Sequence, residues 1–262
     1  MMKELNFDEV RAIQVNILDK VDKFCADNDI IYSISAGTLL GAVRHKGFIP
    51  WDDDIDIMMP RPDYEKFMSL FNIEGLEIFN HIKYSEYNYP FAKVSDIHTK
   101  LIEFDYDYSQ YFGVHVDIFP IDGFPVDTNE QKKHMRNIRK YRRTLYRKLR
   151  VKRKNIFKQL YINLIISRYT YKQLNEKINE VALRYPFGKT KLSGLSVWGY
   201  REKEICLSEI FVNTELIEFE GKKYKSISDY DKYLRSIYGN YMELPPENKR
   251  FPSHNYIAYK IE

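Results

Sequence analysis

The N-terminal part of the chain changes from a helical to a strand-like pattern of apolar residues. Asn6, with an acid three residues later, is typical of a capping box at the start of a helix. Apolar residues then recur at helical spacing and predict a helix over 7–27. Residues 30–35 alternate and predict a strand, and a turn at Gly37 leads into a short helix over 38–44.

Several strands and one helix are expected between the acidic run and residue 119. Pro62 lies where a proline suits a first helical turn. Pro120 is expected to end the last of the strands, which is buried and carries one acid, Asp117. The expected elements are a strand from Asp54, a helix over 61–71, and strands over 76–84, 91–96, 100–104 and 113–119.

The middle of the chain is helical and the end returns to strands. Three helical stretches are expected between 129 and 184, followed by a strand over 193–200 and a hairpin turning near Gly221. A helix over 228–238 is closed by Gly239, and Pro245-Pro246 is expected to end regular structure before a tail that contains His254. We therefore predict an α+β fold: a mixed-sheet core (1–127), an inserted helical subdomain (128–185) and a C-terminal part completing the core (186–262).

Composition limits the class of protein. Of 262 residues, 44% are hydrophobic and 30% charged, which is a globular composition. The two cysteines form no metal pattern, the start lacks the apolar run of a signal peptide, and no window approaches a membrane span, so a reduced cytoplasmic protein is expected. The net charge of +4 hides an asymmetry: Lys132 to Lys154 contain thirteen Lys or Arg and no acid, which leaves the rest of the chain acidic.

Four carboxylates crowd into five residues between Trp51 and Ile57. Such a cluster is stable either when fully solvated or when a hard divalent cation neutralises it, and the apolar flanks argue against a solvated loop. Strand alternation would place Asp52, Asp54 and Asp56 on one face and Asp53 on the other, so Asp53 is the least expected ligand.

These acids can act together with the turn before them. Amides of the turn at Gly37 and Thr38 would point at a phosphate, while Asp54, Asp56 and the later Asp117 would hold Mg²⁺ or Mn²⁺. This pattern is typical of phosphoryl transfer on a metal. An acidic cap or solvated turn is the structural alternative, but it does not require acids at alternate strand positions.

The same residues carry a family resemblance. The segments that carry it are Gly37–Gly41, Phe48–Asp56, Arg61–Tyr64, Phe91–Val94, Val116–Gly123, Tyr230–Leu234, Tyr238–Met242 and Leu244–Pro246. They closely resemble the LicD family of phosphotransferases, which has a nucleotidyltransferase-like fold and includes phosphocholine transferases and the fukutin-related branch. The resemblance covers nearly the whole chain except its basic helical middle.

The resemblance implies transfer of a phospho-alcohol, phosphocholine being favoured, from a CDP-linked donor to a hydroxyl of a cell-surface glycan or its lipid-linked precursor, with release of CMP. It implies that Asp54 and Asp56, with Asp52, bind the metal and that Asp117 is the later acid, as a metal ligand or as the general base. The alternative is a nucleotidyltransferase that moves the nucleoside monophosphate itself and releases pyrophosphate.

Further substrate contacts are expected from basic side chains near the motifs. Lys93 is a candidate to neutralise the diphosphate of the donor, and Arg44 and His45 are candidate phosphate contacts. His254 would return to the site from the tail, as the resemblance suggests.

The aromatic run at Tyr106, Tyr108 and Tyr111 is interleaved with acids, so it suits a quaternary ammonium group, although a Tyr-rich loop edge explains it equally well.

The basic stretch 132–154 has an apolar stripe with two interpretations. The stripe would lie on the inner face of an anionic membrane, or it would instead pack on the core of the protein. Nucleic-acid binding is not expected, because it leaves the acid cluster unexplained.

Overall fold

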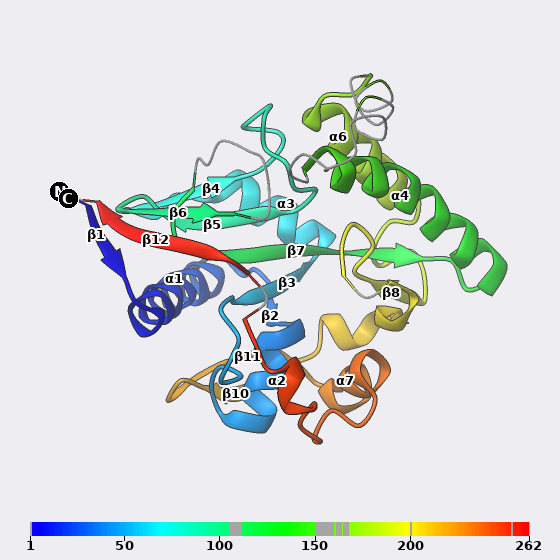
Figure 1. Ribbon diagram of the computed structural model, residues 1–262. Coiled ribbons are helices and arrows are strands. Elements are labelled where there is room, and N and C mark those ends of the chain that lie inside the picture. Colours follow the sequence, from blue (N-terminus) through cyan, green and yellow to red (C-terminus); the bar gives the residue numbers. More distant parts are fainter. Residues whose placement is uncertain are drawn as a thin grey trace.

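The computed structural model describes residues 2–104, 112–149, 168–199, 201–252 and 254–261, together with 160 and 164. The predicted α+β class is confirmed, with helices packed around mixed sheets (Figure 1). The strands are β1 Met2–Leu5, β2 Ser33–Ile34, β3 Asp56–Pro60, β4 Leu76–Phe79, β5 Ala92–Asp96, β6 Thr99–Glu103, β7 His115–Phe124, β8 Leu192–Gly194, β9 Cys206–Leu207, β10 Thr214–Phe219, β11 Lys222–Ile227 and β12 Tyr256–Ile261. The helices are α1 Phe7–Asp27, α2 Ala36–His45, α3 Arg61–Leu70, α4 Thr128–Leu149, α6 Tyr171–Ala182 and α7 Tyr230–Tyr238, with 3₁₀ turns η1 Arg201–Glu204, η2 Ser208–Phe211 and η3 Glu247–Lys249.

The central sheet has the strand order β2-β3-β7-β5-β4. Strands β3 and β7 are parallel, whereas β5 pairs with β7 in the antiparallel sense. Strand β7, with 10 residues, is the longest of the described strands and runs through the middle of the molecule, with β8 paired at its C-terminal end (Figure 1). Because β7 pairs with β3, β5 and β8, it connects the strands before the helical region to the strand that follows it.

The prediction that Pro120 ends a strand is wrong, because β7 continues to Phe124. Ile118 pairs with Ala92 of β5, and pairing with β8 resumes only at Asp122. The N–H of Asp117 points toward β3, and backbone nitrogens alternate between the two edges of a strand. The nitrogen of Pro120 therefore points to the opposite edge of β7, in the gap between the residues that pair with β5 and those that pair with β8. A proline is tolerated there because no ladder hydrogen bond is required of it.

The two ends of the chain pair with each other (Figure 1). β12 lies between β1 and β6 in a three-stranded antiparallel sheet, so the prediction that regular structure ends at Pro245-Pro246 is wrong. The tail alternates weakly, and its pairing partners are distant in sequence, which explains why its strand was missed. The expected strand over 193–200 is also shorter, since β8 ends at Gly194.

Local signals predicted several elements well. The capping box is present, with the N–H of Glu9 donating to the Asn6 side chain at 2.9 Å, and α1 covers the predicted range. The hairpin turns at Glu220 and Gly221, both with positive φ, and Gly239 closes α7 with a φ of 71°. These elements are fixed by contacts within a few residues, so the sequence alone could reveal them.

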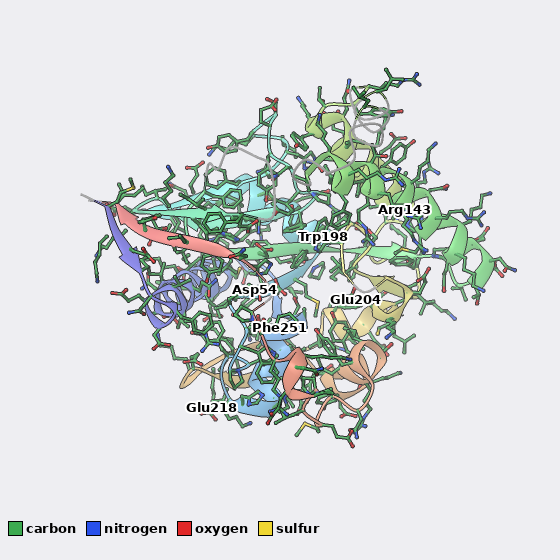
Figure 2. The ribbon with its side chains drawn as sticks, viewed as in Figure 1. Asp54, Arg143, Trp198, Glu204, Glu218 and Phe251 are labelled. Carbon is green, nitrogen blue, oxygen red and sulfur yellow. The ribbon has the colours of Figure 1, made fainter. Side chains whose placement is uncertain are left out.

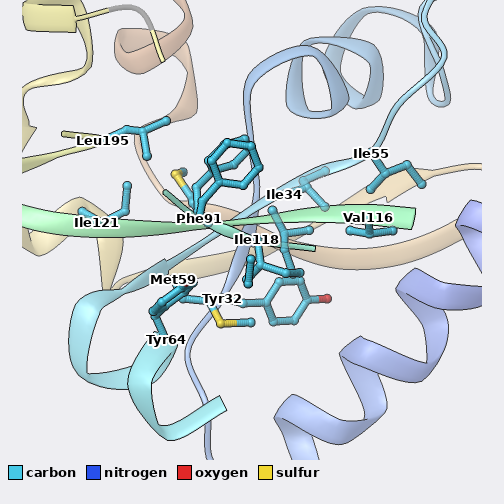
Figure 3. Close-up of a cluster of buried hydrophobic side chains, with 14 of the residues drawn as sticks. Tyr32, Ile34, Ile55, Met59, Tyr64, Phe91, Val116, Ile118, Ile121 and Leu195 are labelled. Carbon is cyan, nitrogen blue, oxygen red and sulfur yellow. The ribbon is translucent and has the colours of Figure 1, made fainter. Parts of the chain in front are cut away.

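The hydrophobic core surrounds β7. Ile118, Met59 and Tyr64 lie on the side of β7 that α1 and α3 cover, while Phe91 and Leu195 lie on the other (Figure 3). Phe91 is 1% exposed and Leu195 7%, and both also line the cavity described below. The floor of the cavity is therefore the rigid core itself.

The apolar stripe of the basic helix α4 is buried in this same core rather than presented to lipid. Met135, Ile138, Leu145 and Leu149 are at most 1% exposed and join the main hydrophobic cluster. Of the two interpretations of the stripe, packing on the core is the correct one. Within the part of the chain that the structure describes, no helix is long and apolar enough to cross a bilayer. The domain boundaries at 127 and 185 stay a prediction.

Candidate active site

A cavity of about 280 Å³ opens over the start of β3 and β7. Asp56 pairs with Asp117 across the parallel ladder, and Asp117 pairs with Lys93 across the antiparallel ladder. Residues that pair directly point to the same face of a sheet, so the three side chains form one row. All three line the cavity. Sheet register therefore brings together two acids and a lysine from three separate sequence motifs.

The acidic loop 52–55 is held in place by α1. Arg11 donates to the carbonyl oxygen of Asp52 at 2.7 Å, and the Gln14 side chain donates to the carbonyl oxygen of Asp53 at 3.0 Å. Both donors lie on the same face of the helix, one turn apart. They fix the backbone at Asp52 and Asp53, which lie in no strand, while at the other end of the loop the carbonyl oxygen of Ile55 accepts from the N–H of Asp117 at 2.9 Å.

The prediction that alternation would turn Asp53 away from its neighbours is wrong, because the strand begins only at Asp56. Asp53 and Asp54 both line the cavity. Asp53 is 3% exposed and bonds to His254, with its two carboxylate oxygens 2.9 Å from Nδ1 and 3.3 Å from the backbone nitrogen. The expected return of His254 to the site is thus what the structure shows, and its partner is Asp53, the acid least expected to be a metal ligand.

Asp53, Asp54 and His254 also form a group whose potential metal-ligand atoms lie within 4.8 Å of one another. Burial alone would lower the pKa of His254, but the hydrogen bond to Asp53 and the charge of Asp54 outweigh it and raise the pKa to about 9. A protonated His254 acts as a counter-ion to this end of the loop, whereas only neutral imidazole is a metal ligand.

Burial and mutual repulsion raise the pKa of the acids on the loop. The pKa of Asp52 rises to about 8, through burial first and then the charge of Asp54. Burial also raises the pKa of Asp54, although the positive charge of His254 opposes it. The pKa of Asp56 rises through burial and the charges of Asp54 and Asp117. Such carboxylates are poorly tolerated as bare anions and are the oxygen ligands that hard divalent cations prefer.

Lys93 is the basic residue in the row of paired residues Asp56, Asp117 and Lys93. It is 3% exposed, and its ammonium nitrogen lies 2.5 Å from Asp117 Oδ1 and 2.9 Å from His115 Nε2. His115 Nδ1 is 2.9 Å from the carbonyl oxygen of Gly113, so Nδ1 is the donor there and Nε2 accepts from Lys93. Burial and the neighbouring ammonium lower the pKa of His115 to about 3, which keeps the imidazole neutral. Lys93 is therefore a charged group held in one position.

Helix α2 begins at the cavity. Its N-cap Ser35 and its first residue Ala36 line the cavity, and the Ser35 side chain makes no capping hydrogen bond. The first-turn N–H groups of a helix attract anions. The predicted Gly37 and Thr38 lie just behind: a Cβ on Gly37 would come within 2.6 Å of an Asp52 oxygen, and the Thr38 hydroxyl accepts from the N–H of Asp56 at 2.8 Å. Both residues thus position the acids.

Two other predicted contacts lie away from the cavity. Arg44 Nη1 donates to the carbonyl oxygen of Tyr241 at 2.8 Å, and Arg44 Nε donates to His45 Nε2 at 2.9 Å. Neither residue is among those that line the cavity. They connect the end of α2 to the segment after α7. The predicted aromatic run at Tyr106, Tyr108 and Tyr111 lies outside the described residues.

Sequence reasoning missed one whole wall of the cavity. It is formed by aromatic side chains and one acid whose segments are far apart in the chain; Phe91 and Phe119 lie in segments that carry the family resemblance, and no local pattern marks the others. The residues of this wall are Tyr89, Phe91, Phe119, Tyr146, Trp198 and Glu204.

Comparisons with known proteins match the part of the chain that carries most of these residues. The family model described as LicD/FKTN/FKRP, nucleotidyltransferase domain, matches residues 29–164, which include the acidic loop, Lys93 and Asp117. The lipopolysaccharide cholinephosphotransferase LicD of Haemophilus influenzae is 33% identical over 268 residues, covering 98% of this chain and 99% of that protein.

Two uncharacterised proteins match shorter stretches. One from Rickettsia typhi is 37% identical over 70 residues, covering 26% of this chain and 23% of that protein. One from Rickettsia prowazekii is 61% identical over 36 residues, covering 14% of each. Because the family model spans more than half of the chain and the Haemophilus relative aligns over almost all of it, the chain belongs to the LicD family.

Proposed function

We propose that this protein transfers phosphocholine from a CDP-linked donor to a hydroxyl of a lipopolysaccharide glycan or its lipid-linked precursor and releases CMP. The observation that carries the proposal is the row Asp56, Asp117 and Lys93 beside the N-terminus of α2, in a chain that aligns end to end with a lipopolysaccharide cholinephosphotransferase. The donor, the metal and the released nucleotide are part of this proposal.

The carboxylates fit a divalent metal. Asp54, Asp56 and Asp117 present oxygen atoms to one cavity, and the mutual repulsion that raises the pKa of Asp56 is the unfavourable energy that a bound cation would remove. We propose that these three residues hold Mg²⁺ or Mn²⁺, with Asp52 supporting them through its contact with Asp54. When bound, such an ion supplies a positive charge beside the transferred phosphate and the hydroxyl that attacks it.

The residues of the chain then bind and orient the donor. Ser35, Ala36 and Lys93 line the cavity, and the first-turn N–H groups of α2 with the ammonium of Lys93 would hold the diphosphate oxygens. The acceptor oxygen forms a bond to the phosphorus that carries choline, the phosphoanhydride bond to CMP breaks, and the hydroxyl proton passes to a carboxylate of the acidic loop. No water is needed in this exchange, which suits a cavity floored by buried core residues.

Product identity tests the proposal. The purified protein would be incubated with Mg²⁺, de-acylated lipopolysaccharide and, in separate reactions, CDP-choline, CDP-ethanolamine, CDP-ribitol or CDP-glycerol, and the nucleotides would be separated by chromatography. We expect CMP, fastest from CDP-choline. Release of pyrophosphate from CTP with a small phosphate acceptor, and no CMP from any of the four donors, would instead support the alternative nucleotidyltransferase.

We further propose that the outer face of α4 contacts anionic lipid at the inner side of the membrane, where a lipid-linked acceptor would be presented to a cytoplasmic enzyme. Arg136, Lys140, Arg143 and Arg147 recur at helical spacing, line one shallow hollow and are exposed. Arg143 is exposed, and Figure 2 shows it at α4, well apart from Asp54. Opposite charges at such a surface contribute about 1 kcal/mol per residue.

Vesicle sedimentation tests this contact. The wild type should sediment with phosphatidylglycerol vesicles at low salt and less at high salt, and Arg143→Gln/Arg147→Gln should weaken binding. Lys223→Gln/Lys225→Gln, on the exposed side of β11, is the matched control. Equal binding by both double variants would rule out α4 as the contact surface.

A further inference from the structure

Four aromatic rings meet at one side of the cavity, with Trp198 in the centre. The Trp198 ring lies 4.8 Å from that of Tyr146, 5.2 Å from that of Phe91 and 5.8 Å from that of Tyr89, measured between centroids. All four residues line the cavity. Phe91 and Tyr89 are buried, whereas Trp198 and Tyr146 are half-buried, so the latter two present ring surface to the space inside.

A buried carboxylate lies at the same side. Glu204 ends the turn η1, is 1% exposed and lines the cavity. The hydroxyl of Tyr233 donates to Glu204 Oε1 at 3.1 Å. Gly199, next to Trp198, makes room for the other oxygen: a Cβ there would come within 2.1 Å of Oε2, and its φ of +76° also favours glycine. The fold thus places an acid against the aromatic wall.

The cavity therefore has two ends of different chemistry, which adjoin at Tyr89 and Phe91, whose ring centroids lie 4.7 and 5.5 Å from the ammonium nitrogen of Lys93. Lys93 and the α2 N-terminus form an end suited to phosphate, with the acids proposed to bind metal beside them. Trp198, Tyr146 and Glu204 form an end suited to a cation with apolar surface, because ring faces and a nearby carboxylate attract such a cation. Figure 2 shows Asp54 apart from Trp198 and Glu204. Phosphocholine is a zwitterion whose two charges would match the two ends.

We propose that Trp198, Tyr146 and Glu204 form the subsite for the trimethylammonium group of the donor, an inference that rests on the proposed function. None of these three residues belongs to the aromatic run at 106–111. Tyr146 comes from α4 and Trp198 from the segment after β8, so the basic helical region contributes directly to the choice of alcohol. An aromatic wall would also suit the cytosine base, but the Glu204 carboxylate beside the rings attracts a cation and has no such attraction for a neutral base.

Binding measurements separate these two ligands. Isothermal titration would compare CDP-choline, CDP-ethanolamine and CMP on the wild type, Trp198→Leu, Tyr146→Leu and Glu204→Gln. Each variant should bind CDP-choline about ten-fold more weakly and bind CMP as the wild type does. Trp198→Phe, which keeps a ring, should recover most of the affinity. Tyr141→Leu is the matched control, since Tyr141 lies on the same helix but not in the cavity.

Three results would overturn the subsite. Equal weakening of CMP and CDP-choline would assign the rings to the base. Unchanged affinity for CDP-choline in all three variants, each with a wild-type melting temperature, would exclude them from donor binding. Failure of the proposed function is distinguishable, because the wild type itself would then neither bind CDP-choline nor release CMP from it, and the inference would fall with it.

Discussion

Replacing Lys93 by Met tests whether the row of paired residues is the working part of the site. Lys93 is 3% exposed and bonds to Asp117 at 2.5 Å. Two unit charges about 4 Å apart attract by roughly 4 kcal/mol at an effective dielectric constant of about 20. Removing one member of a buried pair leaves the other uncompensated, at a cost of about 3–5 kcal/mol. Because the Asp117 side chain keeps 14% exposure, we expect the lower value, about 3 kcal/mol.

Mg²⁺ should reverse much of this loss. A cation at Asp56 and Asp117 would neutralise the carboxylate that the variant leaves unpaired, so the loss of unfolding free energy should be large in EDTA and smaller in Mg²⁺. Catalysis should not recover in the same way, since in the proposed complex the ammonium would also contact the donor phosphate. We expect kcat/KM for CMP release to fall about 100-fold, as for loss of one charge-stabilising group.

Urea denaturation with and without Mg²⁺, together with CMP release, measures both effects. Lys83→Met is the control, because Lys83 pairs with Glu77 on the surface with half of its side chain exposed and should change stability by less than about 1 kcal/mol. The reasoning is refuted if Lys93→Met unfolds like the wild type in EDTA and still releases CMP at the normal rate.

Two further predictions concern the supports of the site. Arg61 and Asp122 form a buried pair with bonds of 2.7 and 2.9 Å, so Asp122→Leu should lower the free energy of unfolding by about 3–5 kcal/mol in urea denaturation, and a loss below about 1 kcal/mol would contradict this. Burial lowers the pKa of His134 to about 4, so its contribution to stability is complete above about pH 6.5 and is lost as the pH falls toward 4. The His134 ring lies between those of Phe124 and Tyr185, so phenylalanine can take its place. Between pH 6.5 and 5 the free energy of unfolding of His134→Phe should therefore fall by about 2 kcal/mol less than that of the wild type, and an equal fall would refute the role of His134 in this pH dependence.

The acids were predictable because they lie in one short run and because Asp117 stands out in an apolar strand. The sequence also indicated Lys93 beside its own strand. What it did not reveal is the register that pairs Asp56 with Asp117 and Asp117 with Lys93. Register across three strands depends on packing of the entire sheet, so no window of sequence contains it.

Other parts of the site depend on contacts between distant segments. Asp53 faces His254 across 201 positions because the loop before β3 is held by α1 rather than by strand pairing. The aromatic wall combines Tyr89, Tyr146 and Trp198 in the same way. A composition rich in Tyr and Phe hides such residues, and only the fold distinguishes the few that meet at the cavity from those that fill the core.

The most direct test of the central claim is a comparison of wild type with Asp56→Asn by phosphorus NMR in the presence of Mg²⁺, CDP-choline and de-acylated lipopolysaccharide. Wild type should convert the diphosphate signals of the donor into one monoester signal from CMP and one diester signal from the modified glycan. Asp56→Asn, checked for a wild-type circular dichroism spectrum, should leave the donor unchanged. Wild-type levels of the diester from Asp56→Asn, or no diester from the wild type, would contradict the account.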